Sequence, residues 1–408
     1  MSCVSGPAPE LTVAQVLKVF LPQYLDRRSV PAHQLKVLRR LAQCHSPELG
    51  WTLWQCQQCH RTHWRPHGCG DRHCPTCQHQ RSRQWLQKQR DALLPVRYFH
   101  WVFTLPAALR PLVLQNAAPL YQLLLQSASA TLLQFGRERF QAELGLTAIL
   151  HTWGQNLMNH PHLHCLVTGG GLTAQNTWAG PQQARWLFPV RAVARMFQAK
   201  FCAGLLQLHT NAKLQFYGQL QPLGRAPAFT ELLRKLATHK WVVFAKGSVV
   251  GPDHVLDYLG RYTHRVAISN GRLRALDPNA RTVSFTYKDY ADGNRLKAMS
   301  LSGVEFIRRL LLHVLPAGFT KIRHYGLLGN NRRRQRLPLA RAALEKSPLR
   351  FDPKTPARAP VSLPLQLACP HCQGTNLSCI GRVDRFGKAT RFTSAMLAAA
   401  ALPYADTS

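Results

Sequence analysis

The sequence predicts an α+β protein with an antiparallel sheet and a cysteine-rich module near its N-terminus. Three observations support this class. Segments rich in aromatic and β-branched residues alternate with segments of helical spacing. Two of the strand segments, 147–155 and 162–169, are separated only by the short stretch NLMNHP, as in a hairpin. The cysteines are grouped in close pairs, which favours thiolate metal sites over disulfides and indicates a reducing compartment.

The elements of the N-terminal half follow from apolar spacing and from the positions of proline. Apolar residues recur at helical spacing before position 45, and Pro22 and Pro31 interrupt the pattern. The stretch YFHWVFTL is aromatic and β-branched, which is typical of a strand. The expected elements are helices in 11–45, a basic helix at 81–94 that ends before Pro95, a strand at 98–105, helices in 107–135, and the hairpin of 147–155 with 162–169.

The C-terminal half predicts further strands and then helices. The stretch KWVVFAK predicts a strand, and turn residues Pro278 and Asn279 separate two strand segments in a second hairpin. The glycine triplet 169–171 is expected to end its strand in a tight turn. The expected elements are a strand at 240–246, a helix at 253–265, a hairpin of 266–276 with 281–290, and helices in 303–345.

Changes in composition divide the chain into five expected units. Prolines concentrate between 347 and 364, as in a linker, and no internal repeat is present. The units are a helical lead-in (1–45), a zinc-binding, DNA-binding module with a linker helix (46–97), a catalytic domain (98–300), a basic helical extension (301–346), and a proline-rich linker with a short cysteine-containing tail (347–408).

The composition also points to a soluble protein with a polyanionic partner. Of 408 residues, 46% are hydrophobic, which is ordinary for a globular protein with a core. Lys and Arg number 52 against 18 acidic residues, and the resulting net charge of +34 favours nucleic acid as the partner. The sequence contains no run of 18 apolar residues and no secretory leader pattern. We therefore expect a cytoplasmic protein that binds no membrane.

The stretch HPHLHCLVTGGG contains a candidate site for a divalent cation. In a strand, residues two apart face the same side, so His162 and His164 can bind one ion while Leu163 packs in the core. A third ligand must then come from the neighbouring strand. Gln155 and His151 are both within plausible reach, and we favour Gln155 because a histidine such as His151 is as easily a buried, hydrogen-bonded residue.

The stretch YLGRYTHR contains a candidate pair of nucleophiles. Tyr258 and Tyr262 are four residues apart, which places them on one face of a helix, where they could also be core tyrosines. The neighbouring cations favour a phosphate ligand; they are Arg261, His264 and Arg265. A phenol is a weak nucleophile at neutral pH, so it needs a polarised phosphorus centre, which the cation at His162 and His164 would provide. No Walker A motif is present, in keeping with strand exchange that needs no nucleotide.

Two cysteine pairs predict a zinc site in the N-terminal module. Cys56 and Cys59 form one C-x-x-C pair, and Cys74 and Cys77 form the other. Further residues close by leave ligand exchange or a second ion open; they are Cys44, His45, His60, Cys69 and His73. The tail contains half of another site, with Cys369 and Cys372 and with Cys379 as a possible third ligand. No catalytic role is expected there.

Long blocks of this sequence resemble the HUH-type two-tyrosine transposases of the insertion sequence 91 type, which move DNA by rolling-circle transposition. The blocks are GDRHCPTCQ, FTLP, HTWGQNLMNHPHLHCLVTGGGL, WVVFAKGSVVGPDHVLDYLGRYTHRVAISN and HYGLLGNNRRR. The resemblance implies that His162 and His164 form the histidine motif and that Tyr258 and Tyr262 are paired nucleophiles. It also implies a five-stranded antiparallel sheet with flanking helices.

The function expected from these features is nicking and joining of single-stranded DNA through 5′-phosphotyrosine intermediates, with Mg²⁺ or Mn²⁺ at the histidines and Zn²⁺ in the N-terminal module. The DNA contacts expected beside the tyrosines are Arg261, His264 and Arg265, and those expected in the basic run are Arg332, Arg333 and Arg334. Two alternatives remain. One is a non-catalytic zinc-containing DNA-binding protein, and the other is a carboxylate-based nuclease, for which the 18 acidic residues offer few candidates.

Overall fold

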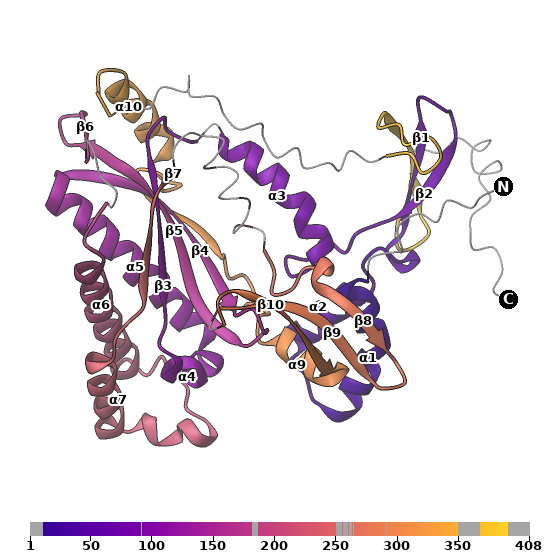
Figure 1. Cartoon of the computed structure of the whole chain (residues 1–408), viewed down its shortest axis with the longest axis horizontal. Coiled ribbons are helices and arrows are strands. Elements are labelled where there is room, and N and C mark those ends of the chain that lie inside the picture. Colours follow the sequence, from indigo (N-terminus) through magenta and orange to yellow (C-terminus); the bar gives the residue numbers. More distant parts are fainter. Residues whose placement is uncertain are drawn as a thin grey trace.

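The computed structural model consists of three antiparallel sheets with helices packed around them (Figure 1). It describes residues 11–90, 92–181, 187–249, 255, 260, 263, 265–290, 292–349 and 368–390. Four short 3-10 helices lie between the main elements, at Pro47–Leu49, Ala107–Leu109, Gly218–Gly224 and Asn270–Arg272. None of the helices in these ranges is long and apolar enough to cross a membrane.

The central sheet has the strand order β11-β4-β5-β3-β7, and every neighbouring pair is antiparallel. The mixed α+β class and the five-stranded antiparallel sheet are therefore confirmed. The strands are β3 (Tyr98–Thr104), β4 (Ala142–Trp153), β5 (Asn159–Thr173), β7 (Val243–Val249) and β11 (Ile322–Gly326), and the two-residue β6 (Trp178–Ala179) pairs with the end of β5. Strand β11 comes from residues that were expected to be helical.

One face of the central sheet is covered by long helices (Figure 1). Side chains of β5 alternate, so Leu163, Cys165 and Val167 point to this face and enter the largest hydrophobic core. Trp101 and Phe103 of β3 lie in the same core. The covering helices are α4 (Arg110–Gln115), α5 (Ala117–Phe140), α6 (Val190–Thr210) and α7 (Ala226–Thr238). This apolar layer holds the central strands rigidly from behind.

The other face of the central sheet carries the histidines, together with a smaller apolar cluster. Tyr98, Ile149 and Leu166 belong to this cluster, and so does Val255. Helix α10 (Arg333–Glu345) contributes Leu337, Ala340, Ala343 and Leu344 to the cluster. The segment that follows α3 (Pro75–Arg90) contributes Ala92, Leu94 and Val96. We call this side of the sheet the histidine face.

A second body contains the N-terminal helices and a three-stranded sheet. Helices α1 (Val13–Arg27), α2 (Ala32–Ala42) and α9 (Gly303–Leu311) share one core with strands β8 (Leu273–Asp277), β9 (Thr282–Asp289) and β10 (Arg295–Ser302). Phe20 of α1 lies in this core with Phe285 and Phe306. The expected helical lead-in therefore packs against residues almost 300 positions later in the sequence, and β10 is a strand that the sequence did not predict.

The third sheet joins the two ends of the described chain (Figure 1). Its strand order is β13-β12-β1-β2, with β1 (Trp51–Cys56), β2 (Thr62–Pro66), β12 (Leu377–Val383) and β13 (Ala389–Thr390). Strand β1 pairs along its length with β12, with Trp51 opposite Val383 and Cys56 opposite Leu377. The tail segment 368–390 is thus a structural part of the N-terminal module.

The glycine triplet lies within strand β5 and does not form the expected turn, because β5 continues to Thr173. A Cβ atom on Gly171 would lie 2.3 Å from the carbonyl oxygen of Glu143 in β4, and Gly170 has a φ of +124°. The register of β4 against β5 shifts at this point. The glycines therefore allow close backbone approach at a bulge.

Candidate active site

Three histidines converge on the histidine face of the central sheet. His162 and His164 are two residues apart in β5, and His151 of β4 lies directly opposite His162 in the strand register. Their ligand nitrogens all lie within 4.8 Å of one another. The ring centroids of His151 and His164 are 4.5 Å apart, and those of His162 and His164 are 4.9 Å apart. Adjacent strands thus bring together three imidazoles that are separated in the sequence.

The structure places His151, the alternative third ligand, beside His162 and His164, whereas Gln155 lies further along the chain. Strand β4 ends at Trp153, and Gln155 lies in the turn that follows. Its side-chain nitrogen donates to the hydroxyl of Tyr290 at 3.3 Å. Because the strand does not extend to residue 155, the alternation that aligns His151 with His162 no longer applies there. His151 is 3% exposed and stacks on Trp153.

His162 and His164 are suited to be neutral metal ligands. Burial lowers the pKa of His162 to about 4, and burial also lowers the pKa of His164 well below 6.5. Nδ1 of His162 donates to the carbonyl oxygen of His160 at 2.7 Å, which leaves Nε2 unprotonated. Three uncharged imidazoles would hold a divalent cation without neutralising its charge, so the donor set fits such an ion.

A fourth histidine, His100, which the sequence did not single out, contacts His164. His100 of β3 lies on the same face, with Nε2 at 2.9 Å from Nδ1 of His164. Burial lowers the pKa of His100 to about 3, so it is neutral. The signal in the sequence was a histidine in the middle of the otherwise apolar strand segment YFHWVFTL.

The predicted nucleophiles lie outside the described residues. This applies to Tyr258 and Tyr262, and also to Arg261 and His264. Three neighbours in the same segment are described. Val255 is completely buried in the apolar cluster of the histidine face, Thr263 is completely buried, and a Cβ atom on Gly260 would lie 3.0 Å from Leu86 of α3.

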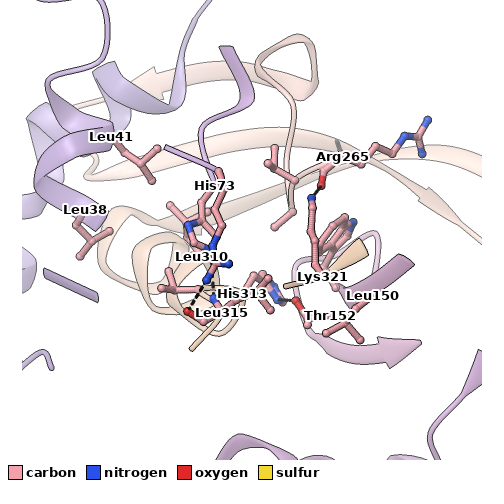
Figure 2. Close-up of a pocket in the computed structure, with 15 residues that line it drawn as sticks. Leu38, Leu41, His73, Leu150, Thr152, Arg265, Leu310, His313, Leu315 and Lys321 are labelled. Atoms are coloured by element: carbon pink, nitrogen blue, oxygen red, sulfur yellow. Dashed lines mark hydrogen bonds between the residues drawn. The ribbon is translucent and has the colours of Figure 1, made fainter. Parts of the chain in front are cut away.

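Arg265, which follows the tyrosine segment, lines a small cavity (Figure 2). Arg265 is exposed, and its carbonyl oxygen accepts a hydrogen bond from Nζ of Lys321 at 3.1 Å. Burial lowers the pKa of Lys321 to about 8. Beside it, Nδ1 of His313 forms a hydrogen bond with the hydroxyl of Thr152 in β4, and Nε2 donates to the carbonyl oxygen of Leu157. The cavity volume of about 20 Å³ holds little more than one water, so these contacts are structural.

The expected basic run lies at the start of α10. Arg332 and Arg334 are exposed, and Arg333 is half-buried. Arg332 and Arg336 both contact the carboxylate of Glu143, at 3.4 and 3.3 Å. The run therefore has an acidic partner on β4, and Arg334 remains on the surface.

Eight of the described cysteines form two groups of four, whereas the sequence predicted one site from Cys56, Cys59, Cys74 and Cys77. Cys74 and Cys77 join Cys44 and Cys69, and the separations between sulfur atoms are 3.4 Å for Cys74 with Cys44 and 3.6 Å for Cys44 with Cys77. Hydrogen bonds from the other three thiols lower the pKa of Cys77, as expected where thiols crowd around a thiolate. Cys56 and Cys59 belong instead to the second group, with Cys369 and Cys372.

Other residues considered as zinc ligands have different roles. Nε2 of His73 accepts a hydrogen bond from the backbone of Leu315 at 3.1 Å, and its Nδ1 lies 2.8 Å from Asp71. Cys379 is directed to the carbonyl of Gly381 in its own strand and is in neither group. Cys56 and Cys59 lie apart from Cys74 and Cys77 because strand β1, which ends at Cys56, pairs with strand β12 of the tail segment.

Comparison with known proteins assigns the chain to a family. A family model described as a putative transposase matches residues 145–336, and one described as a transposase zinc-binding domain matches residues 16–105. A putative transposase, y4qJ, of Sinorhizobium fredii is 43% identical over 346 residues, which is 84% of this chain and 85% of that protein. The transposase for insertion sequence element IS801 of Pseudomonas savastanoi pv. phaseolicola is 27% identical over 320 residues, 76% of this chain and 74% of that protein.

No solved structure matches this chain. The matched segments contain the features described above, since residues 145–336 include all three histidines and residues 16–105 include one complete group of four cysteines. The chain therefore belongs to the IS91 family of transposases and carries an N-terminal zinc-binding domain with cysteine tetrads.

Proposed function

We propose that this transposase nicks and rejoins single-stranded DNA through covalent 5′-phosphotyrosine intermediates formed by Tyr258 and Tyr262. One observation carries the proposal: Val255, three residues before Tyr258, is buried in the apolar cluster on the same face of the sheet as His151, His162 and His164. The histidines proposed to bind metal and Val255, which precedes the tyrosines, therefore lie on the same side of the central sheet. A segment packed on the opposite face would have made the reaction impossible.

The chemistry assigned to the histidines is metal binding. A Mg²⁺ or Mn²⁺ ion held there supplies positive charge that polarises the scissile phosphate. His162 and His164 stay uncharged at neutral pH because burial keeps the pKa of His162 near 4 and that of His164 well below its ordinary value. The rigid antiparallel pair of β4 and β5 keeps the ligand nitrogens in place before DNA arrives.

The bond changes balance without a nucleotide. The phenolic oxygen of Tyr262 forms a bond to phosphorus, the bond from phosphorus to the 3′-oxygen breaks, and the phenolic proton ends on that oxygen. The products are a 5′-phosphotyrosine and a free 3′-hydroxyl. Because one phosphodiester replaces another, the reverse reaction at a target strand rejoins DNA at little energetic cost. The second tyrosine, Tyr258, would take a strand in the later step.

Contacts with the DNA backbone come from basic residues near the two ends of the histidine face. Arg265 follows the tyrosine segment directly and is exposed, and Arg334 is exposed at the start of α10. Arg332 is exposed and also contacts Glu143. Binding through such residues should weaken with salt, with a slope of about 0.7 per phosphate contacted on single strands.

Cleavage of end-labelled oligonucleotides tests the proposal. A set of single strands covering the DNA that flanks the coding sequence is labelled at either end and incubated with protein and Mn²⁺. A 5′-phosphotyrosine places the 3′-labelled product on the protein and leaves the 5′-labelled product shorter and free. Exchange of both tyrosines for phenylalanine is the control. A non-catalytic DNA-binding protein would give no covalent band, and cleavage that survives the double exchange would favour another nucleophile.

A further inference from the structure

The second group of cysteines brings together the N-terminal module and the tail segment 368–390. Cys56 and Cys59 end and follow strand β1, and Cys369 and Cys372 precede strand β12. The sulfur atoms of Cys56 and Cys372 are 3.6 Å apart, and so are those of Cys59 and Cys369. Residues 369 and 372 lie beyond both of the segments that match family models.

The two cysteine pairs have the same local backbone structure. In the first pair, the amide of Gln58 donates to Sγ of Cys56 at 3.4 Å, and His60 has a φ of +58°. In the second pair, the amide of His371 donates to Sγ of Cys369 at 3.4 Å. Gln373, the residue after the second cysteine, has a φ of +60°.

The two loops share a tight turn around a C-x-x-C pair. The left-handed residue after each pair closes a tight turn, and the amide of that residue donates to the carbonyl of the first cysteine at 2.9 Å in both loops. Amide hydrogen bonds to sulfur stabilise a thiolate. In structural zinc sites, each C-x-x-C loop presents its two sulfurs to the same metal ion, and two such loops facing each other provide four ligands.

The sulfur geometry fits zinc and excludes disulfides. With zinc–sulfur bonds of about 2.3 Å, the sulfurs of a tetrahedral site are about 3.8 Å apart. The separations of 3.6 Å across the two pairs are close to this value. They are far longer than the bond of about 2.05 Å in a disulfide.

We propose that Cys56, Cys59, Cys369 and Cys372 form a second zinc site, which fastens the C-terminal tail to the N-terminal zinc-binding domain. The tail then completes that domain as strands β12 and β13 of its sheet. Two further contacts cross the same boundary: the amide of Gln57 donates to the carbonyl of Asn376 at 2.9 Å, and Arg65 donates to the carbonyl of Ala368 at 2.9 Å.

Zinc content measured on the full chain tests the site. His162→Ala and His164→Ala are introduced first, so that the histidine site contributes no metal. In this background we expect two zinc ions per chain by elemental analysis. The double exchange Cys369→Ser, Cys372→Ser should lower the value to one, and Cys74→Ser, Cys77→Ser should also lower it to one through the other group. An unchanged zinc content in the Cys369, Cys372 variant overturns the proposal.

Cys379→Ser is the matched control, because Cys379 lies in the same tail segment but outside both groups. It should keep two zinc ions. Loss of one ion from this variant would show that disturbance of the tail, and not loss of a ligand, lowers the zinc content. That result would overturn the assignment of the four ligands.

A cleavage experiment tests the fastening and remains decisive if a cysteine variant folds poorly. A specific protease site is placed between residues 349 and 368, and the purified full chain is cut and passed over a sizing column. The tail should remain with the rest of the chain in the unsubstituted protein and in Cys379→Ser. It should separate in Cys369→Ser, Cys372→Ser. Equal retention in all three, or separation in all three, overturns the role of the site. Neither measurement depends on DNA cleavage, so failure here is distinct from failure of the proposed function.

Discussion

Nδ1 of His164 and Nε2 of His100 lie 2.9 Å apart, across the neighbouring strands β5 and β3. With the proton on Nδ1 of His164, His100 accepts the hydrogen bond and Nε2 of His164 remains available for a metal ion. Nδ1 of His162 likewise donates to the carbonyl oxygen of His160, which leaves Nε2 of His162 available for the metal ion. Each ligand of the β5 pair is therefore oriented by a hydrogen bond to its second nitrogen.

His100→Ala should weaken metal binding without removing a ligand. Loss of a group that orients a histidine typically costs 10- to 100-fold in metal affinity or activity. His100→Gln, whose side-chain oxygen can accept the same hydrogen bond, should recover most of it. Calorimetric titration with Mn²⁺ measures the affinities, and thermal unfolding of the metal-free proteins separates the effect from stability. Equal affinity in the alanine variant and the unsubstituted protein would contradict the assignment.

His151→Ala should abolish metal-dependent DNA cleavage, because the structure makes His151 the third imidazole of the group. Gln155→Ala should change the rate by about twofold or less, since Gln155 lies beyond the end of β4 and its side chain contacts Tyr290. The two variants form a matched pair from the same hairpin. Cleavage rates over a range of Mn²⁺ concentrations provide the measurement, and a larger loss with Gln155→Ala would restore the interpretation made from the sequence.

Tyr262→Phe should abolish the first cleavage, because the phenyl ring has no oxygen to attack phosphorus. Tyr258→Phe should still form the first covalent adduct and fail at a later step. Denaturing gels of 3′-labelled oligonucleotides detect the adduct, and a transposition assay in cells detects the complete reaction. If Tyr258→Phe supports full transposition, the two tyrosines do not divide the work in this way.

The metal-free protein should lose stability as pH falls from about 6.5 to about 4. Burial lowers the pKa of His313 from 6.5 to about 4, so in this range the unfolded chain binds a proton that the folded chain does not. Unfolding is then favoured by at most about 1.4 kcal/mol per pH unit for each such group. Above pH 6.5 the effect is absent.

His313→Gln should make this decline shallower, because glutamine can keep the contacts to Thr152 and Leu157 without titrating. Urea unfolding at several pH values gives the free energies. The control is His239→Gln at an exposed position. An identical pH dependence in the His313 variant would show that other buried groups account for the decline.

Local patterns predicted several of the strands of the central sheet and two of the three histidines. The strand segments at 98–105 and 162–169 were recognisable because aromatic, β-branched and alternating residues report burial directly. The choice between His151 and Gln155 depends on where β4 ends, and in the structure this strand ends at Trp153, two residues before Gln155. Strand β10 was missed because its side chains are mostly exposed or half-buried, so it has no apolar alternation.

Contacts between residues far apart in the chain could not be predicted from the sequence. Nothing near Cys56 indicates that its partners lie more than 300 positions away, so the nearer pair at Cys74 was the natural choice. The same limit applies to Cys44 and Cys69, which were noted as neighbours but could not be assigned to a group. Strand β11 was missed for a related reason, because a short strand at a sheet edge depends on its pairing with β4.

The shared core of α1, α2 and α9 has a consequence for synthesis on the ribosome. Helix α2 covers part of the apolar face of α1 early, but the part around Phe20 is covered only after α9 has been made, about 280 residues later. At roughly 5 to 20 residues per second, the nascent chain exposes that face for on the order of 15 to 55 s. Helix α1 thus leaves the tunnel long before its last packing partner, and a chaperone would meet it in the interval.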